Sequence, residues 1–352
     1  MSSTPQARED RRRASHQRVV RRRRGAAAGL LLLAVLIIVL VSSGGGSRHA
    51  STAAKHAGSR AGSAGSASVR LKAVVQQSGR LPAPVQDAAV AAIGPDSALL
   101  MGGLDQADTS VSDILRATLA GATKVGALPT ALHDATASPL AGQAYLFGGG
   151  ATSQFSGILA VAASGAAQPA GQLPTPASDV ASAVIAETAY IVGGYDGESP
   201  LPTIVAFRPG APPRTAGTLP KPLRYAAVAA QGGQLVIAGG TSGTSASSDV
   251  YRFDPRTGQV QSFAHLPQPL THAAAAALGG VVFVIGGRGA TTESQTNNIL
   301  AISPTGAASV AGTLPQALSD VSAVTLGERV LLAGGRDGTG QLHDSILTLS
   351  AR

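Results

Sequence analysis

An apolar run that ends in two glycines recurs six times in this 352-residue chain, each time after a Leu-Pro pair and a run of small residues. Successive Leu-Pro pairs begin 45 to 48 residues apart, and in five of the six repeats the doublet begins 20 residues after its Leu. The leucines are Leu81, Leu128, Leu173, Leu219, Leu266 and Leu314. The doublets are Gly102 and Gly103, Gly148 and Gly149, Gly193 and Gly194, Gly239 and Gly240, Gly286 and Gly287, and Gly334 and Gly335. Such a fixed interval predicts a repeat architecture.

Each repeat contains four predicted strands. The small-residue run, as in residues 87–92, is the innermost strand, where neighbouring sheets converge and bulky side chains do not fit. The apolar run, as in residues 145–149, has no polar face, which is expected of a strand buried on both sides. A third strand alternates apolar and polar residues, as in residues 249–254, and a weaker fourth leads to the next Leu-Pro pair. The 44 Gly and 21 Pro also favour an all-β fold with many turns.

Three short segments carry a family resemblance: residues 193–197 (Gly-Gly-Tyr-Asp-Gly), 334–338 (Gly-Gly-Arg-Asp-Gly) and 250–255 (Val-Tyr-Arg-Phe-Asp-Pro). From about Val69 to Arg352 the chain resembles the Kelch-repeat β-propellers of the galactose oxidase and Kelch-like superfamily, in a membrane-anchored bacterial form. It departs from their pattern because it has no Trp, and only Tyr251 fills the usual Tyr position. The resemblance implies an all-β, six-bladed Kelch-type propeller.

Closure of the propeller follows from the order of the strands. The sixth repeat stops after its third strand, whereas residues 69–76 form a predicted strand ahead of the first Leu-Pro pair. We therefore expect the strand at residues 69–78 to complete the last blade, so that no sheet edge stays open.

Three segments precede the propeller: a basic tail (1–24), an apolar segment (25–42) and a Gly/Ser/Ala linker (43–68) that is predicted to be disordered. Residues 25–41 carry no charge and as a helix would extend about 26 Å, enough to cross a bilayer. Four arginines at 21–24 adjoin this segment, which predicts a single-pass signal anchor with a cytoplasmic N-terminus and an extracytoplasmic propeller. A cleaved signal peptide and secretion are the alternative, although the apolar run exceeds the usual length of a signal sequence.

The net charge of +8 belongs to these N-terminal segments. Residues 1–24 carry +7 and residues 43–68 carry +3, which leaves −2 for residues 69–352. We interpret the arginines as an orientation signal that also touches anionic headgroups, and expect no nucleic-acid binding. The absence of Cys excludes disulfides, a Cys nucleophile and the copper centre of Kelch-type galactose oxidases.

The residue six positions after each Leu is the main candidate for ligand binding. We expect these residues to open the innermost strands, and the Kelch resemblance implies that they lie near one mouth of the central channel. A ring of carboxylates, a phenol and an imidazole could bind a basic peptide, a sugar or a cation. The alternative is that they cap turns, a common use of Asp. The six residues are Asp87, Asp134, Asp179, Tyr225, His272 and Asp320.

Other candidates are weaker. Residues after the doublets head exposed loops and are candidate loop contacts: Tyr195, Asp196, Arg288, Arg336 and Asp337. The polar residues before the third strands are interpreted as turn residues: Asp113, Asp249, Asn298 and Asp344. No phosphate-binding loop, His-Glu-x-x-His or Gly-x-Ser-x-Gly motif occurs, so we expect no catalytic set, cofactor or metal.

The leading functional hypothesis is a membrane-tethered, extracytoplasmic module that binds a protein or a glycan. The alternative is a carbohydrate-active enzyme, an epimerase or a lyase, with its site at the channel mouth. A structural role without a ligand is the third hypothesis.

Overall fold

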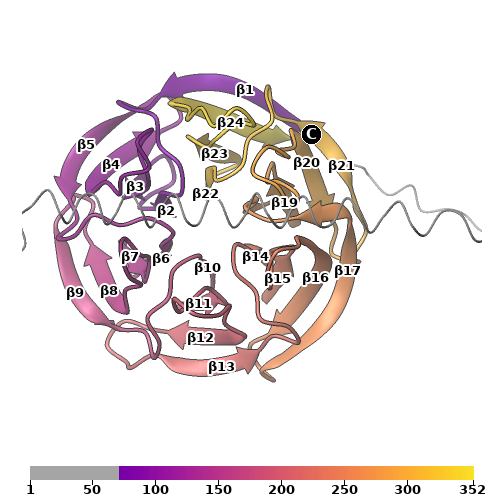
Figure 1. The fold of residues 1–352 in the computed structure, drawn as a ribbon, viewed down its shortest axis with the longest axis horizontal. Coiled ribbons are helices and arrows are strands. Elements are labelled where there is room, and N and C mark those ends of the chain that lie inside the picture. The colour runs from indigo at the N-terminus through magenta and orange to yellow at the C-terminus, as the bar shows by residue number, and fades with distance from the viewer. Residues whose placement is uncertain (1–70) are drawn as a thin grey trace, which may run out of the picture. The chain divides into compact units, whose positions relative to one another are not determined.

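The computed structural model describes residues 71–352, which belong to the compact unit Ala67–Arg352. In this part of the chain all regular structure is β, arranged as six four-stranded antiparallel sheets around a central channel (Figure 1). No helix within residues 71–352 is long and apolar enough to cross a membrane. The predicted tail, transmembrane segment and linker (1–24, 25–42 and 43–68) lie outside the described residues.

The sheets are blades 1 to 6 in chain order, each listed from its innermost to its outermost strand. Blade 1 comprises β2 (Ala89–Ala92), β3 (Ala98–Met101), β4 (Asp113–Thr118) and β5 (Gly121–Ala127). Blade 2 comprises β6 (Thr136–Leu140), β7 (Gln143–Phe147), β8 (Gly157–Val161) and β9 (Ala167–Gln172). Blade 3 comprises β10 (Ala181–Ile185), β11 (Thr188–Val192), β12 (Thr203–Phe207) and β13 (Arg214–Thr218).

The other three blades repeat this order. Blade 4 comprises β14 (Ala227–Gln231), β15 (Gln234–Ala238), β16 (Ser247–Asp254) and β17 (Gln259–Leu270). Blade 5 comprises β18 (Ala274–Leu278), β19 (Val281–Ile285), β20 (Asn298–Ile302) and β21 (Ala308–Thr313). Blade 6 comprises β22 (Ser322–Leu326), β23 (Arg329–Ala333), β24 (Ser345–Ala351) and β1 (Ala73–Arg80).

Blade 6 joins the two ends of the described chain. Strand β1 pairs antiparallel with β24, with Ala73 opposite Ala351 and Arg80 opposite Ser345 (Figure 1). The strand begins and ends somewhat later than the 69–78 predicted from the sequence. It continues to Arg80 because the next residue, Leu81, turns inward, where its N–H donates to the carbonyl of Asp344 at 2.7 Å and its side chain is buried.

The glycine doublets fasten each blade to the next. Gly286 has a φ of 60°, and a Cβ there would collide with the carbonyl oxygen of Leu318 in blade 6. The N–H of Gly287 donates to that same carbonyl at 2.9 Å. Every doublet repeats this arrangement with the segment that leads into the next blade, and blade 6 returns to blade 1 through Gly334, Gly335 and Val85. The repeat glycines therefore serve the contact between blades, which only a residue without a side chain permits.

The hydrophobic core is divided among the blade interfaces. Six clusters of buried side chains each combine residues of two neighbouring blades, for example Tyr190 and Ile204 of blade 3 with Ile237 and Phe253 of blade 4. The rings of Tyr190 and Phe253 meet edge to face at 5.4 Å. No cluster fills the centre, where the small side chains of the innermost strands leave a channel of about 440 Å³.

Candidate functional site

The six candidate residues come together at one end of the channel, and we call them the mouth ring. The N–H of each one donates to the carbonyl of the mouth-ring residue in the preceding blade, over distances from 2.8 to 3.3 Å. Asp87 donates to Asp320 and so closes the circuit. The backbone groups that face around the ring are thus bonded to one another.

Each mouth-ring residue lies in the left-handed region, with φ between 54° and 61°. Asp and His tolerate this conformation better than most residues, whereas a bulky Tyr there is unusual. The expectation that these residues open the innermost strands is wrong by two positions, because β2 begins at Ala89 and not at Asp87. The N–H of each ring residue is directed to the neighbouring blade and is not available to the ladder of its own sheet.

The four carboxyl groups of the mouth ring interact mainly with one another. Burial raises the pKa of Asp87 well above its ordinary value, and the charge of Asp320 and a hydrogen bond to it act in the same direction. Burial, with the charge and hydrogen bonding of Asp179, likewise raises the pKa of Asp134. The buried carboxyls of Asp87 and Asp134 therefore favour their neutral forms more than exposed aspartates do. No group of three acidic or His side chains suited to a metal occurs in the described part of the chain.

Arg224, next to Tyr225 in the sequence, compensates part of this acidity. Its Nε lies 2.6 Å from a carboxylate oxygen of Asp179, in an orientation too poor for a hydrogen bond, so the contact is an ion pair. Its guanidinium lies over the rings of Tyr195 and Tyr225, 4.4 and 4.7 Å from their centroids. The Tyr225 hydroxyl accepts from Arg224 at 3.2 Å and donates to Asp134 at 3.1 Å. Burial and these carboxylates raise the pKa of Tyr225, so the phenol stays protonated.

His272 is neutral and holds the guanidinium of Arg288. Nη2 of Arg288 lies 3.0 Å from Nε2 of His272, and because a guanidinium only donates, Nε2 must be the acceptor. The proton is then on Nδ1, which donates to the hydroxyl of Thr271 at 3.1 Å. Burial, together with the charges of Arg288 and Arg224, lowers the pKa of His272 to about 4 despite Asp320. The imidazole also stacks on Tyr225, with the centroids 3.6 Å apart.

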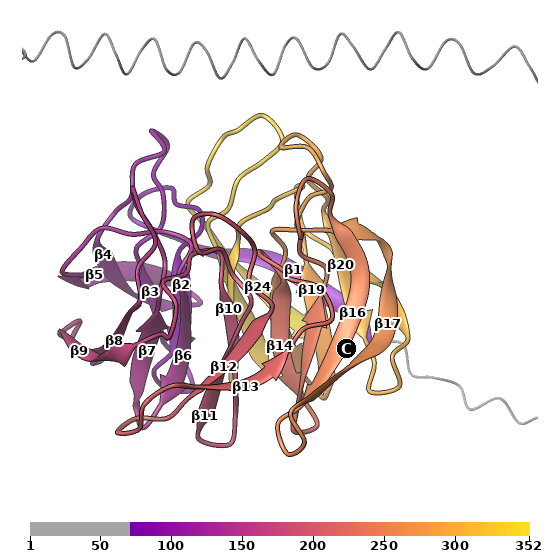
Figure 2. The same ribbon diagram turned by 60° about the horizontal axis from the view of Figure 1, so that its bottom comes forward.

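The loops after the doublets of blades 5, 6 and 1 contact one another and form a rim at the mouth. The side chain of Gln106 in blade 1 donates to the carbonyl of Gly340 at 3.1 Å and accepts from the N–H of Leu342 at 2.9 Å, both in blade 6. The loops of blades 5 and 6 also meet, since Gly338 lies close to Glu293. In Figure 2 a yellow loop rises highest above the sheets, and an orange loop and a purple loop reach nearly as high.

The candidate loop contacts separate into two groups. Asp196 and Asp337 hold their own loops: Asp196 accepts from two backbone N–H groups at 2.8 Å, and Asp337 accepts from the N–H groups of Thr339 and Gln341. The backbone hydrogen bonds lower the pKa of Asp196. Burial opposes the shift at Asp337, but side-chain hydrogen bonds from Thr339 and His343, together with the backbone bonds, lower its pKa. Tyr195, Arg288 and Arg336 lie directly after their doublets. Each forms an isolated β-bridge to the residue that precedes a mouth-ring residue.

The predicted turn residues before the third strands take part in ion pairs in three of the four blades concerned. The partners are Lys124 for Asp113 at 2.6 Å, Lys221 for Asp249 at 3.1 Å, and Arg80 for Asp344 at 2.7 Å. Asp113 and Asp249 lie in the third strands β4 and β16, and Asp344 directly precedes β24. Asn298 makes no such pair within the described residues.

Sequence reasoning missed the residues that immediately precede the mouth ring. They form the β-bridges to the post-doublet residues and so belong to the wall of the mouth: Gln86, His133, Ser178, Arg224, Thr271 and Ser319. Their position, five residues after each Leu, could have identified them. Their importance could not be seen, because it arises from the bridge to a residue about 17 positions further along.

One group in this wall has the composition of a hydrolytic triad. The hydroxyl of Ser110 lies 2.9 Å from Nδ1 of His133, and Nε2 of His133 lies 3.6 Å from Asp134. The second distance is too long for a hydrogen bond, and the raised pKa of Asp134 favours its neutral form. A neutral acid would not stabilise an imidazolium, so this group does not meet the requirements of a nucleophilic triad.

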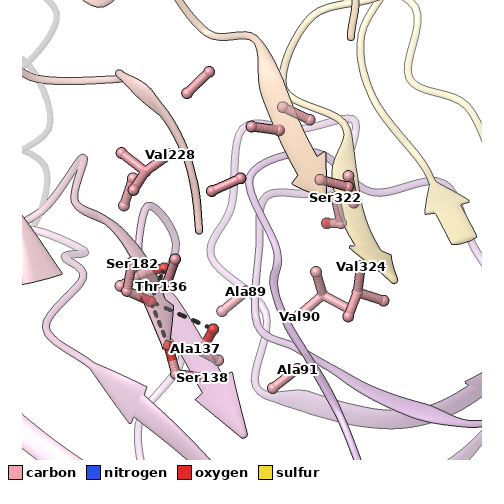
Figure 3. Close-up of a pocket in the computed structure, with 18 of the residues that line it drawn as sticks. Ala89, Val90, Ala91, Thr136, Ala137, Ser138, Ser182, Val228, Ser322 and Val324 are labelled. Carbon is pink, nitrogen blue, oxygen red and sulfur yellow. Dashed lines mark hydrogen bonds between the residues drawn. The ribbon is translucent and has the colours of Figure 1, made fainter. Parts of the chain in front are cut away.

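Two cavities open at this mouth. The channel itself is lined below the mouth ring mainly by Ala and Val, and its hydroxyls are engaged: Ser182 bonds Thr136 at 2.8 Å and Ser138 at 2.9 Å (Figure 3). The other, the blade 4–5 cavity, measures about 370 Å³ and lies beside the ring. Its lining consists of Arg224, Tyr225, Thr241, Gly243, Thr244, Ala246, Thr271, His272, Arg288, Gly289 and Ala290.

Comparison with known proteins agrees with this geometry. Residues 222–267, which cover most of blade 4, match the Kelch motif. The chain is a six-bladed β-propeller that carries a Kelch motif. A solved structure titled "Structure of YjhT" is similar to it with a TM-score of 0.67 and 16% identity, covering 78% of this chain and 99% of that one. At this identity the similarity concerns the fold alone. No curated protein matches the chain in sequence.

Proposed function

We propose that this protein is a binding module, tethered to the extracytoplasmic side of a membrane by residues 25–42, that captures a protein or glycan partner at the mouth of the propeller. The observation that carries the proposal is the charge distribution of the mouth. Arg288 and Arg336 flank the mouth, and within residues 71–352 no carboxylate lies within 4 Å of either guanidinium. The Nε of Arg336 is buried without a hydrogen-bond partner among these residues.

An acidic group on the partner would supply what these guanidiniums lack. Arg binds carboxylates and other oxyanions through two parallel N–H donors, which adds geometric selectivity to the charge. The mouth ring then acts as a support and not as the contact surface, since its carboxyls bond to one another and to Arg224, Tyr225 and Ser319. The epimerase or lyase hypothesis has no comparable support: it needs a general acid or base that can exchange protons with a ligand, and His272, Tyr225 and Asp134 are engaged with neighbouring side chains.

The experiment is partner capture from the extracytoplasmic side with the full-length chain, combined with glycan and peptide arrays. We expect the double variant Arg288→Gln and Arg336→Gln to lose capture about ten- to a hundredfold, the usual effect of removing charged hydrogen bonds. The control is Arg329→Gln, which removes an exposed arginine at the start of β23 and leaves the mouth unchanged. Equal capture by the double variant and the control would contradict the proposal, as would the absence of any bound partner.

A further inference from the structure

The blade 4–5 cavity has an unusual chemical lining. It contains two arginines, an imidazole, a phenol and three threonines, and no acidic residue. The cavity lies between the start of β14 and β18 and the post-doublet segments of blades 4 and 5. A concave site of several hundred Å³ with a few directed polar groups is the usual form of a small-ligand site.

Arg288 is fixed on both its backbone and its side chain. Its N–H and carbonyl exchange hydrogen bonds with Thr271, each at 2.9 Å, so its Cα is fixed against blade 5. Its guanidinium donates to the neutral His272 at 3.0 Å. One of its five N–H groups is used in this way, and most of the donor fork remains available. A guanidinium positioned before binding loses less conformational freedom when it binds.

The two arginines of the cavity differ in charge compensation. Arg224 is paired with Asp179, whereas Arg288 has no carboxylate within 4 Å in the described part of the chain. The exposed Glu293, in the same loop as Arg288, forms no ion pair with it. The pKa of Glu293 is lowered mainly by a hydrogen bond from Thr292, and the charge of Arg288 contributes least. The cavity therefore keeps one uncompensated positive charge.

Thr271 provides a second indication, which follows from the tautomer that Arg288 imposes on His272. Its side chain lines the cavity and the residue is only 4% exposed. Because its oxygen accepts from Nδ1 of His272, its own O–H proton remains to be donated, and no acceptor for that proton occurs among residues 71–352. A buried hydroxyl donor without an acceptor is costly unless something in the cavity accepts from it.

We propose that the blade 4–5 cavity is an oxyanion site, in which Arg288 and the Thr271 hydroxyl bind a carboxylate, sulfate or phosphate group and Arg224 supplies further positive charge. This inference rests on the proposed function and locates the acidic group of the partner within the mouth. Arg336 lies at the equivalent position of blade 6 but does not line this cavity, so it takes no part in the site.

Equilibrium dialysis of the full-length chain with radiolabelled sulfate, phosphate and acetate, at constant ionic strength in chloride, tests the site. We expect one bound anion per chain for at least one probe. Comparison of sulfate and phosphate with acetate distinguishes a site for tetrahedral anions from a site for carboxylates. Arg288→Gln should weaken binding about ten- to a hundredfold. The control Arg329→Gln, which removes an exposed arginine at the start of β23, should bind as the unaltered chain does. Should Arg288→Gln fail to fold, Arg288→Lys keeps the charge but loses the fork, and it should still weaken binding.

Two results would overturn the site: no saturable binding of any probe, or equal loss in Arg329→Gln and Arg288→Gln. Failure here is distinguishable from failure of the proposed function. Partner capture that persists without anion binding refutes the oxyanion site and leaves the binding module standing. Anion binding without any captured partner refutes the binding module and leaves the site.

Discussion

The protonation of His272 gives the most direct test of the geometry at the mouth. The unfolded chain has an imidazole pKa near the ordinary value of 6.5, and in the folded protein it is lowered to about 4. Between these values the unfolded state binds more protons, so folding becomes less favourable as the pH falls. The stability is fully present above pH 6.5 and is lost as the pH drops through the window from 6.5 to 4. Over the whole window the loss is about 3 kcal/mol, at about 1.4 kcal/mol per pH unit.

The comparison that isolates this effect is urea unfolding of the unaltered chain and of His272→Asn between pH 7.5 and pH 4. Asn tolerates the φ of 56° at this position but does not titrate. It should be less stable at pH 7.5, because it loses the stack on Tyr225 and the acceptor for Arg288. The difference should shrink by about 3 kcal/mol as the pH approaches 4. Since both proteins carry the same ring carboxyls, the contributions of those groups largely cancel in the difference.

Nitrogen and proton NMR of the imidazole provides the independent measurement. We expect a titration midpoint near pH 4 and, above it, a proton on Nδ1 with Nε2 as the acceptor. A midpoint between pH 6 and 7, or a stability difference that does not change with pH, would refute the reasoning. A proton on Nε2 would contradict the hydrogen bond from Arg288.

Two further substitutions test the ring and the blade contacts. Asp134 has a raised pKa in the folded protein, so the unaltered chain loses stability as the pH rises from 3.8 through the folded pKa. Asn does not titrate, so Asp134→Asn should become increasingly stable relative to the unaltered chain from pH 4 to pH 8. Thermal unfolding of the control Asp196→Asn should show no such trend over this range, because a carboxyl with a lowered pKa has its full contribution above 3.8; parallel trends would contradict the assignment. Gly286→Ala should cost about 2–4 kcal/mol in urea unfolding, from a strained φ and the collision with Leu318. Gly279→Ala, with a similar φ of 59° and open space around it, should cost only about 1–2 kcal/mol, and equal costs would refute the blade contact.

The architecture could be predicted from the sequence because the repeated positions hold residue types, such as paired glycines, that have few other structural roles. Two glycines at a fixed distance from a Leu-Pro pair predict a close backbone approach, and the structure places the carbonyl of the next blade there. The apolar runs predicted strands buried on both faces, as seen in β7, β11 and β19. Both features can be recognised from local sequence patterns. Because the same pattern occurs six times, it is not a chance arrangement of residues.

The site could be predicted only in outline. Spacing alone identified Asp87 and its five counterparts, but the direction of their backbone N–H groups depends on the neighbouring blade and cannot be read from one repeat. Arg288 and His272 are 16 positions apart in the sequence, so their contact could not be predicted from it. The tautomer of His272 follows only from the geometry of that contact. Thr271 gave no signal of its own, because a threonine before a histidine is chemically ordinary until its hydroxyl is found buried.

The circuit of backbone hydrogen bonds explains how one mouth can hold different chemistry in each blade. Because the N–H and carbonyl groups carry the contacts between neighbouring blades, the fold constrains each ring position mainly to a residue that tolerates a positive φ. Asp, Tyr and His all meet that condition here, and they differ in charge and hydrogen bonding. The post-doublet position is constrained in the same way, since its backbone bridges the residue before the ring. Leu104, Gly150, Thr241 and Arg288 occupy equivalent positions in different blades, so the placement of a guanidinium at only two of the six is not imposed by the fold. That freedom is the reason to attribute Arg288 and Arg336 to recognition.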